Sequence, residues 1–376
     1  MSENSEDYSR AIADRCSRLA RQAGIAAVAA SLVFGNIAQA QLNKSGKVQG
    51  PKTEAGAGSA IQGLVNQAAA NGGKDYPGMG FRLTSPAGIA RSAKFKIKMA
   101  ARGERPKRVL LTDWLPPVGD QGDQGSCAGW ATAYYCYTYS VAKQRKLTSE
   151  QRSDPRFQFS PAFLYHKVNG GVDSGSKMRD IFDVLGNEGC ASLAEMPYSD
   201  KDLTSAPSAE AVTRAGRYKA RSVGCLFTGG KADIDALKTY LAEVQLPFVA
   251  AIPIFTDFPK GKLDDSFVYS LSVPAIKANF KGGHAVTIVG YDDDKKAFRM
   301  VNSWGPGWGD GGFIWLSEDF VKEWAMEGWA QVPGGVVARD TVRGKPSAEK
   351  PIRASKNVLL EPPTVAPAKT PGLMKR

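Results

Sequence analysis

The spacing of apolar side chains predicts helices in the first half of the chain's central part. The expected helices cover residues 127–142, 160–165 and 178–185. The second of them begins with Ser160 and Pro161, which are typical of an N-cap and of the first helical position. Residues from about 109 to 215 are therefore expected to form a helical lobe.

After residue 218 the pattern changes to the alternation and the short apolar runs of β-strands. Strands are expected at residues 218–223, 247–252, 285–291, 297–302 and 312–316, with one amphipathic helix at residues 232–243. Three aspartates at positions 292–294 supply a turn between two of these strands. Residues 216–338 are therefore expected to form a β-rich lobe.

The net charge of +12 is carried by segments outside these two lobes. Residues 91–108 hold eight Lys or Arg and one acidic residue, and residues 339–376 hold nine and three. Residues 109–338 carry a net charge of −4. Because nucleic-acid binding depends on a positive surface, we expect no nucleic acid as a partner of the two lobes.

The first 40 residues have the three parts of a signal peptide. Four arginines precede an apolar run, Ala23–Gly35, and Ala38-Gln39-Ala40 supplies a cleavage pattern before Gln41. A membrane anchor is the alternative, but this run of 13 residues is short against the roughly 20 that span a bilayer. We expect an exported protein, periplasmic or secreted, with no stable membrane span once the signal is removed.

The opposite end of the chain has the composition of a disordered tail. Residues 339–376 contain six prolines among mixed basic residues, which cannot bury a core. Contact of this tail with an anionic surface is one hypothesis, and a tail that is only solvated is the alternative.

A turn-rich polar segment, residues 117–126, runs directly into the first expected helix. Cys127 therefore lies near a helix N-terminus, where the dipole and the free N–H groups favour thiolate over thiol. Far downstream, His284 stands in the sequence Gly-His-Ala-Val and Asn302 in Asn-Ser-Trp-Gly. A thiolate that attacks a carbonyl needs a base, a group that orients the base and donors for the oxyanion.

The order Cys127, His284 and Asn302, with Gln121 six residues before the cysteine, resembles the papain family of cysteine peptidases. The resemblance covers roughly residues 109–330. It implies an α+β, papain-like, two-lobed fold, with a helical left domain, an antiparallel β-barrel-like right domain and the active-site cleft between them. It also implies a cysteine endopeptidase that acts on proteins or peptides through an acyl-enzyme intermediate. We expect a monomer.

The resemblance gives each of these four residues a role. Cys127 is the nucleophile, and His284 forms a thiolate–imidazolium pair with it and later protonates the leaving amine. Asn302 orients the imidazole. The side chain of Gln121 and the backbone N–H of Cys127 form the oxyanion hole.

Two more residues are expected next to the substrate. The indole of Trp304 shields the hydrogen bond between Asn302 and His284, and the region of Gly175 holds the substrate's backbone. In such an ion pair each charge stabilises the other, so the pKa of Cys127 is expected to be depressed and that of His284 raised.

The segment around the cysteine departs from the family's pattern and allows two registers. In the first, Gln121 keeps its six-residue spacing, Gln124 replaces a disulfide cysteine, and Ala128 stands where Trp is usual. In the second, Cys127 matches the disulfide cysteine, and the nucleophile is absent. The second register implies a catalytically inactive peptide-binding or scaffold protein. We prefer the first because it needs no gap.

The remaining histidine and cysteines give no sign of a second site. His166 lies within an expected helix and is interpreted as structural. Cys136, Cys190 and Cys225 permit one disulfide and one free thiol, in a pairing that the sequence does not decide. No metal-ligand spacing or phosphate loop is present, so neither a metal nor a nucleotide cofactor is expected.

Residues 41–108 show no sustained apolar periodicity. By position, and by resemblance to the family, they are a candidate pro-segment that covers the cleft until it is cut away. A disordered linker is the alternative. Lys107-Arg108 offers a basic cleavage site, which places the expected mature N-terminus near Val109.

Overall fold

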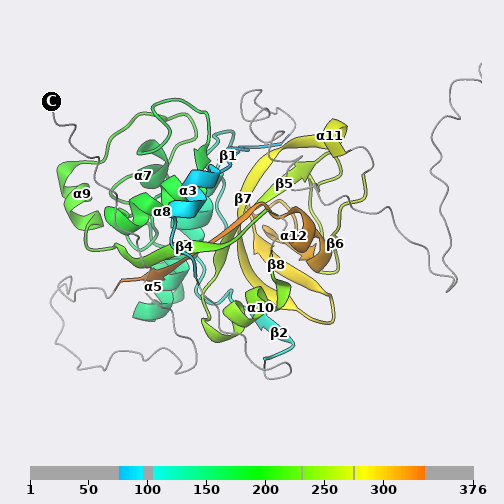
Figure 1. The fold of residues 1–376 in the computed structure, drawn as a ribbon. Coiled ribbons are helices and arrows are strands. Elements are labelled where there is room, and N and C mark those ends of the chain that lie inside the picture. Colours follow the sequence, from blue (N-terminus) through cyan, green and yellow to red (C-terminus); the bar gives the residue numbers. More distant parts are fainter. Residues whose placement is uncertain (1–75, 96–104, 230–231, 274–275, 335–376) are drawn as a thin grey trace, which may run out of the picture. The chain divides into compact units, whose positions relative to one another are not determined.

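One sheet of eight strands carries much of the core (Figure 1). The computed structural model describes residues 76–95, 105–229, 232–273 and 276–334, which all lie in one compact unit. The predicted signal peptide and the predicted tail lie outside these residues. The strands follow the order β4-β10-β5-β7-β8-β9-β6, with β2 paired to β7. Their bounds are β2 Arg108–Leu110, β4 Ala220–Thr228, β5 Phe248–Phe255, β6 Val268–Tyr269, β7 Phe280–Asp292, β8 Ala297–Val301, β9 Phe313–Ser317 and β10 Glu327–Pro333.

β7 is the longest strand of this sheet and pairs with three others, β2, β5 and β8. β5 is buried along its whole length, as its continuous apolar sequence requires. All pairs in the sheet are antiparallel except that of β6 with β9. Because β7 lies inside the sheet and is long, it connects the two regions discussed below.

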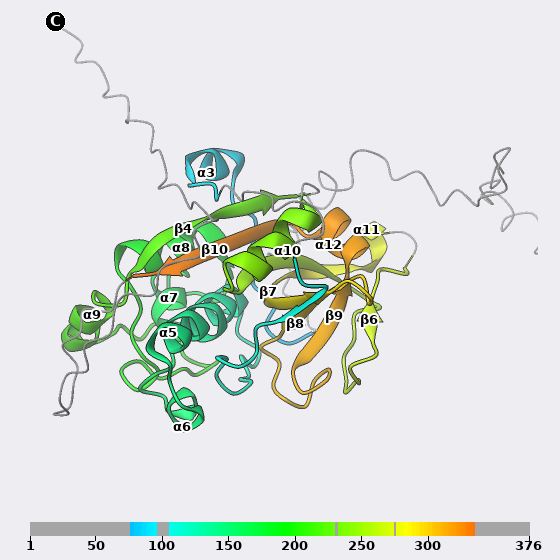
Figure 2. The same ribbon diagram turned by 90° about the horizontal axis from the view of Figure 1, so that it is seen from below.

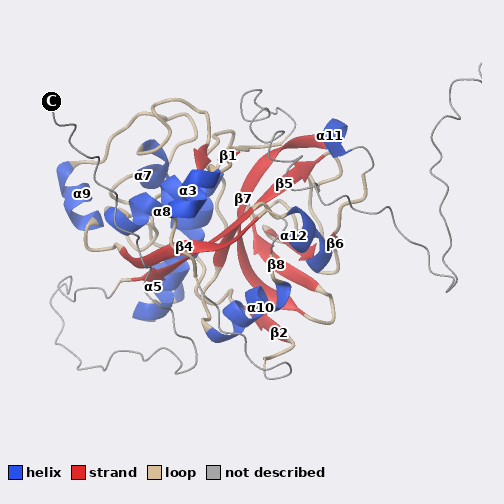
Figure 3. Cartoon of the chain, viewed as in Figure 1, coloured by secondary structure: helices blue, strands red, loops and turns tan. Residues whose placement is uncertain are grey.

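The helices gather mainly on one side of the molecule and the strands on the other (Figure 3). The helices of that side are α4 Cys127–Gly129, η1 Trp130–Tyr137, α5 Thr138–Arg145, α6 Ser149–Ser153, α7 Pro161–His166, α8 Met178–Asn187 and α9 Ala209–Ala215. Two more, α10 Ile234–Glu243 and α12 Glu318–Trp324, pack against the sheet (Figure 2), and α11 covers Ile276–Asn279. Within the described ranges, no helix combines the length and the apolar character needed to cross a bilayer.

The predicted helical and β-rich halves are confirmed, with element ends that differ by a few residues. The helix predicted after Cys127 is continuous as far as Arg145, but its middle, η1, is a π-helix. Ser160 caps α7 by accepting a hydrogen bond from the backbone N–H of Phe163, as the sequence indicated. β10 was not predicted, because a glycine and a proline interrupt its sequence and its apolar residues do not alternate.

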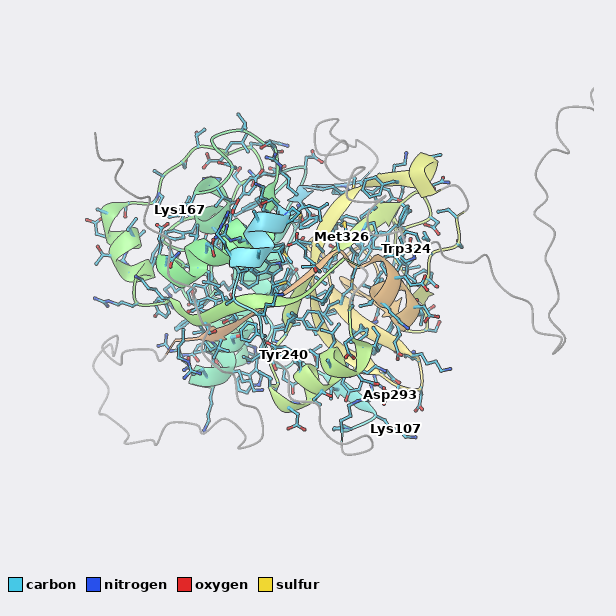
Figure 4. All side chains as sticks on the ribbon, viewed as in Figure 1. Lys107, Lys167, Tyr240, Asp293, Trp324 and Met326 are labelled. Carbon is cyan, nitrogen blue, oxygen red and sulfur yellow. The ribbon has the colours of Figure 1, made fainter. Side chains whose placement is uncertain are left out.

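Residues 105–110, which we call the anchor segment, are built into the sheet. β2 pairs antiparallel with the end of β7. The backbone N–H of Asp293 donates to the carbonyl of Lys107 over 2.8 Å, and the two residues lie side by side in Figure 4. The guanidinium of Arg105 forms ion pairs with Asp235 and Asp293.

Candidate active site

Cys127 is the first residue of α4, and its side chain is completely buried. α4 packs against β7, which carries His284. The sulfur accepts a backbone hydrogen bond from Ala285, the residue that follows His284. The fold therefore brings the predicted nucleophile and the predicted base together, from a helix and from a strand that are far apart in the sequence.

His284 and Asn302 meet because β7 and β8 are paired, and Asn302 follows β8 directly. Nε2 of His284 and Oδ1 of Asn302 are 2.7 Å apart. The same Oδ1 accepts a hydrogen bond from the backbone N–H of Ser303, so Asn302 presents its oxygen to the ring and His284 donates. Nδ1 of His284 is buried without a hydrogen-bond partner among the described residues, which leaves it free to exchange a proton.

The indole of Trp304 covers the imidazole. The centroids of the two rings are 4.7 Å apart, with an angle of 32° between their planes. Trp304 is itself buried. This position agrees with the shielding role that the sequence suggested, because the indole keeps water from the bond between His284 and Asn302.

Gln121 is held at the site through every polar group it has. Its backbone N–H donates to the carbonyl of Ser303, and its Oε1 accepts a hydrogen bond from the Ser303 hydroxyl. The hydroxyl of Tyr198 donates to its carbonyl over 2.7 Å. Its Nε2 donates to two backbone carbonyls, Gln124 over 2.8 Å and Gly78 over 2.5 Å. The second of these carbonyls comes from the region predicted to be a pro-segment or linker.

Residues 76–95, which we call the strap, lie against this site. β1, Phe81–Arg82, pairs in parallel with β3, Ser176–Lys177. The backbone N–H of Ser176 donates to the carbonyl of Gly80 over 2.8 Å, and the backbone of Gly80 also hydrogen-bonds to the sulfur of Cys127. The backbone of the strap therefore covers the sulfur of Cys127.

Gly175 has the close contact with extended backbone that the sequence suggested for it. Its φ is +72°, and a Cβ at this position would lie 2.0 Å from the carbonyl oxygen of Gly80. Only glycine satisfies both conditions without strain. In this structure the backbone that Gly175 contacts belongs to the strap.

Side chains fasten the strap at its first residue and near its middle. At its start the ring of Tyr76 stacks on Trp304, with centroids 5.9 Å apart, and its hydroxyl lies 2.9 Å from the carbonyl of Phe255. Near its middle the backbone N–H and the hydroxyl of Thr84 donate to Glu327. α3, Pro86–Arg91, follows and lies outside β4 (Figure 2).

Burial under the strap sets the protonation states. It raises the pKa of Cys127, although backbone hydrogen bonds from Ala285 and Gly80 oppose the rise. It lowers the pKa of His284 to about 4, although the hydrogen bond to Asn302 opposes the fall. Both directions are opposite to those predicted for an ion pair, because the strap excludes the water that would solvate either charge. The covered site favours a neutral thiol beside a neutral imidazole.

The surroundings of Cys127 favour the first of the two registers. Gln124, which replaces a disulfide cysteine in the first register, is buried. Its Nε2 donates to the carbonyl of Asp202 over 2.7 Å, so this amide joins the segment before Cys127 to the loop that contains Asp202. Ala128 is fully buried within the helix. Two positions on, the indole of Trp130 packs on Tyr134 and Tyr198.

The other candidate residues are structural. Both ring nitrogens of His166 are within hydrogen-bond distance of backbone carbonyls, those of Ser205 and Asp202. All four cysteines of the described residues are buried free thiols, so the disulfide that the sequence permitted is not formed. The sequence missed Glu327 and the strap. The glycines at positions 78 and 80, between Tyr76 and Phe81, are a signal for close backbone contact that could have indicated the strap.

The sequence profile of a family described as papain family cysteine protease matches residues 111–332. Ananain from Ananas comosus is 26% identical over 249 residues, which cover 63% of each chain. A cathepsin L-like proteinase from Phaedon cochleariae is 29% identical over 234 residues, or 61% of this chain and 63% of that protein. This chain therefore spans less than two thirds of the length of these two relatives.

Solved structures agree with the sequence comparisons. Xylellain, a cysteine protease from Xylella fastidiosa, has a TM-score of 0.58 and 26% identity, over 68% of this chain and 96% of that one. Digestive procathepsin L2 from Tenebrio molitor has a TM-score of 0.54 and 21% identity, over 69% of this chain and 79% of that one, and shows the fold alone. The family match leaves out the strap.

Proposed function

Because the chain belongs to the papain family of cysteine proteases and has its α+β fold, we propose that it hydrolyses peptide bonds with Cys127 as the nucleophile and His284 as the proton carrier. The observation that carries this proposal is the 2.7 Å contact between His284 and Asn302, which leaves Nδ1 of His284 free beside a buried thiol. The reaction requires that the strap leave the cleft first.

In the first half of the reaction, His284 holds the proton of Cys127 while the sulfur attacks the carbonyl carbon of the scissile bond. The C–N bond breaks as His284 gives that proton to the leaving amine, and a thioester remains. Water then attacks the thioester with His284 as the base, and Cys127 leaves as the thiol. The Nε2 of Gln121 and the backbone N–H of Cys127 donate to the oxyanion.

We also propose that the protein is made as an exported precursor whose strap is the inhibitory part of a pro-segment. Support comes from the contacts of the strap with Gln121, Cys127 and Trp304, which a substrate would also need. The anchor segment is bonded into the sheet at Arg105 and Lys107. We therefore place the activating cut before Arg105, upstream of the site after Lys107-Arg108 that the sequence suggested. N-terminal sequencing of the active form tests this, and an active form that begins at Gln41 would favour a linker.

Substitution of the proposed catalytic residues tests the reaction. In chains from which the strap has been released, Cys127→Ala and His284→Ala are expected to abolish peptidase activity without unfolding the protein. Asn302→Ala should cause a smaller loss, because Asn302 only orients the base. Labelling by an irreversible thiol-directed peptidyl probe separates the enzyme from a non-catalytic peptide-binding protein. Turnover by Cys127→Ala would require another nucleophile.

A further inference from the structure

One buried tyrosine lies where the helix of Cys127 meets two loops of the site. Tyr135 is part of η1, in the continuous helix that begins with Cys127, and it is completely buried. Its hydroxyl lies 2.9 Å from the carbonyl oxygen of Asn302 and 3.0 Å from the backbone nitrogen of Gly119. Tyr135 therefore contacts the segment that holds Asn302 and the segment that leads to Gln121, although the proposed reaction gives it no part.

Hydrogen bonding fixes the direction in which this hydroxyl points its proton. A carbonyl oxygen can only accept and a backbone N–H can only donate, so Gly119 donates to the hydroxyl and the hydroxyl donates to Asn302. Burial raises the pKa of Tyr135, although the hydrogen bond from Gly119 opposes the rise, so the hydroxyl keeps its proton. The result is a neutral donor held against the backbone of Asn302.

The side chain of Asn302 depends on such support. Its Oδ1 is 2.7 Å from Nε2 of His284 and accepts a second hydrogen bond from the N–H of Ser303. Its Nδ2 is buried and has no hydrogen-bond partner among the described residues. The direction of the amide therefore follows from the position of the Asn302 backbone. That backbone donates to the carbonyl of Gly312 over 2.9 Å and accepts from Tyr135.

Other contacts hold the rest of the site without Tyr135. The hydroxyl of Thr287, in β7, donates to the carbonyl of Ala131, in η1, over 2.9 Å, so the helix is bonded directly to the strand of His284. Gln121 has hydrogen bonds of its own to Ser303 and Tyr198. Loss of the Tyr135 hydroxyl should therefore act mainly on Asn302.

We propose that Tyr135 is a positioning residue that holds Asn302 in the place from which it orients His284. The inference rests on the proposed peptidase function. Tyr135 acts through the backbone of Asn302, so its hydroxyl affects the chemical step and not the binding of the substrate. Loss of an interaction of this kind lowers kcat and leaves KM unchanged.

The test compares Tyr135→Phe with Tyr240→Phe in strap-released enzyme. Tyr240 is the matched control, because its hydroxyl is also buried but has no hydrogen-bond partner among the described residues. Since small misplacements of a catalytic group are costly, kcat of Tyr135→Phe should fall about tenfold, with KM unchanged. Tyr240→Phe should keep both constants. Active sites are counted with the irreversible thiol-directed probe, so unfolded molecules do not enter kcat.

A double-mutant cycle shows whether the effect passes through Asn302. In Asn302→Ala no amide is left to position, so the addition of Tyr135→Phe should change kcat less than about twofold. If the two losses multiply instead, Tyr135 acts on another group and the inference is wrong.

Two unnatural residues keep the test decisive even if Tyr135→Phe does not fold. At position 135, 4-fluorophenylalanine fills the space of the hydroxyl but cannot donate a hydrogen bond, whereas 4-aminophenylalanine can. The amino variant should have the higher kcat, by about tenfold. Equal kcat in these two variants would contradict the inference.

The outcomes separate this inference from the function on which it rests. If the unchanged enzyme cleaves peptides and Tyr135→Phe does so as fast as Tyr240→Phe, the inference is wrong while the peptidase function stands. If the unchanged enzyme cleaves no peptide, both are wrong.

Discussion

The strap and the anchor segment both precede the helical lobe, and the sequence predicted them as parts of one stretch, yet the protein binds them differently. The strap is held by groups that take part in the proposed reaction, among them Nε2 of Gln121 and the sulfur of Cys127. The anchor segment is held by Asp235 and Asp293, and by the end of β7, none of which lies in the proposed reaction. Contacts that block the proposed active site have to break before a substrate can bind. Contacts away from that site can persist in the active enzyme.

β7 contacts both the strap and the anchor segment, one near each of its ends. At one end of β7, Gly282 and Gly283 lie against Met79 and Phe81 of the strap. At the other end, Gly290 pairs with Leu110 of the anchor segment. In the proposed processing, the boundary between precursor and enzyme lies between strap and anchor segment. Three experiments test whether these two segments are independent.

The largest effect is expected from expelling the strap. A Cβ on Gly80 would lie 1.9 Å from the backbone oxygen of Gly125, so Gly80→Val cannot keep its place in the cleft. Overpacking of this kind costs about 1–3 kcal/mol, and the alkylation rate of Cys127 by iodoacetamide in the full chain should rise up to about 100-fold. Gly261→Val is the control, because a Cβ there would meet nothing within 4 Å. Equal rates in the two variants would show that the strap does not protect the thiol.

A smaller effect is expected from acid, through His284. Its pKa is about 4 in the covered site against an ordinary value of 6.5, so between these pH values the open or unfolded chain binds a proton that the covered chain does not. The stability of the covered form is present above pH 6.5 and is lost as the pH falls toward 4. Between pH 6.5 and 5 the loss is about 2 kcal/mol at 1.36 kcal/mol per pKa unit.

Urea unfolding of the precursor at several pH values measures this loss. Glu327 acts in the opposite direction, because burial raises the pKa of this acid and protonation then favours the covered form. The comparison is therefore made in Glu327→Gln, with and without His284→Gln. An acid-dependent loss of the same size in both would assign it to groups other than His284.

The smallest effect is expected from the anchor segment. Arg105→Ala removes the ion pairs with Asp235 and Asp293, and should lower the free energy of unfolding by about 1 kcal/mol. The alkylation rate of Cys127 should not change, because these contacts lie away from the strap. A faster alkylation in Arg105→Ala would mean that strap and anchor segment open together, and the comparison would fail.

The sequence could indicate the candidate catalytic residues because each is a side chain with its own motif. The positions of Cys127, His284 and Asn302 follow once the helix and the strands next to them are predicted. Those elements have a clear periodicity of apolar residues. The contact between His284 and Asn302 then follows from the pairing of β7 with β8.

Neither the strap nor the pKa shifts of Cys127 and His284 could be predicted from such motifs. The strap contacts the site through the backbones of Gly78 and Gly80, which carry no side-chain signal. The pKa of Cys127 was predicted from the helix N-terminus and from an ion pair with His284, but burial has the larger effect and raises it. Nothing in the sequence distinguishes Glu327 from a surface acid, and Thr84, which donates to it, lies far upstream in the chain.

The hydrogen bond from Gln121 to Gly78 determines how inhibition by the strap depends on protein concentration. The group that occupies the oxyanion position is covalently part of the same molecule, so its local concentration is on the order of millimolar and does not change with dilution. A precursor diluted to nanomolar levels is then as inactive as a concentrated one. A free peptide with the sequence of residues 76–95 would have to approach that millimolar level to inhibit as well, so once the tether is cut, dilution alone is enough to make activation irreversible.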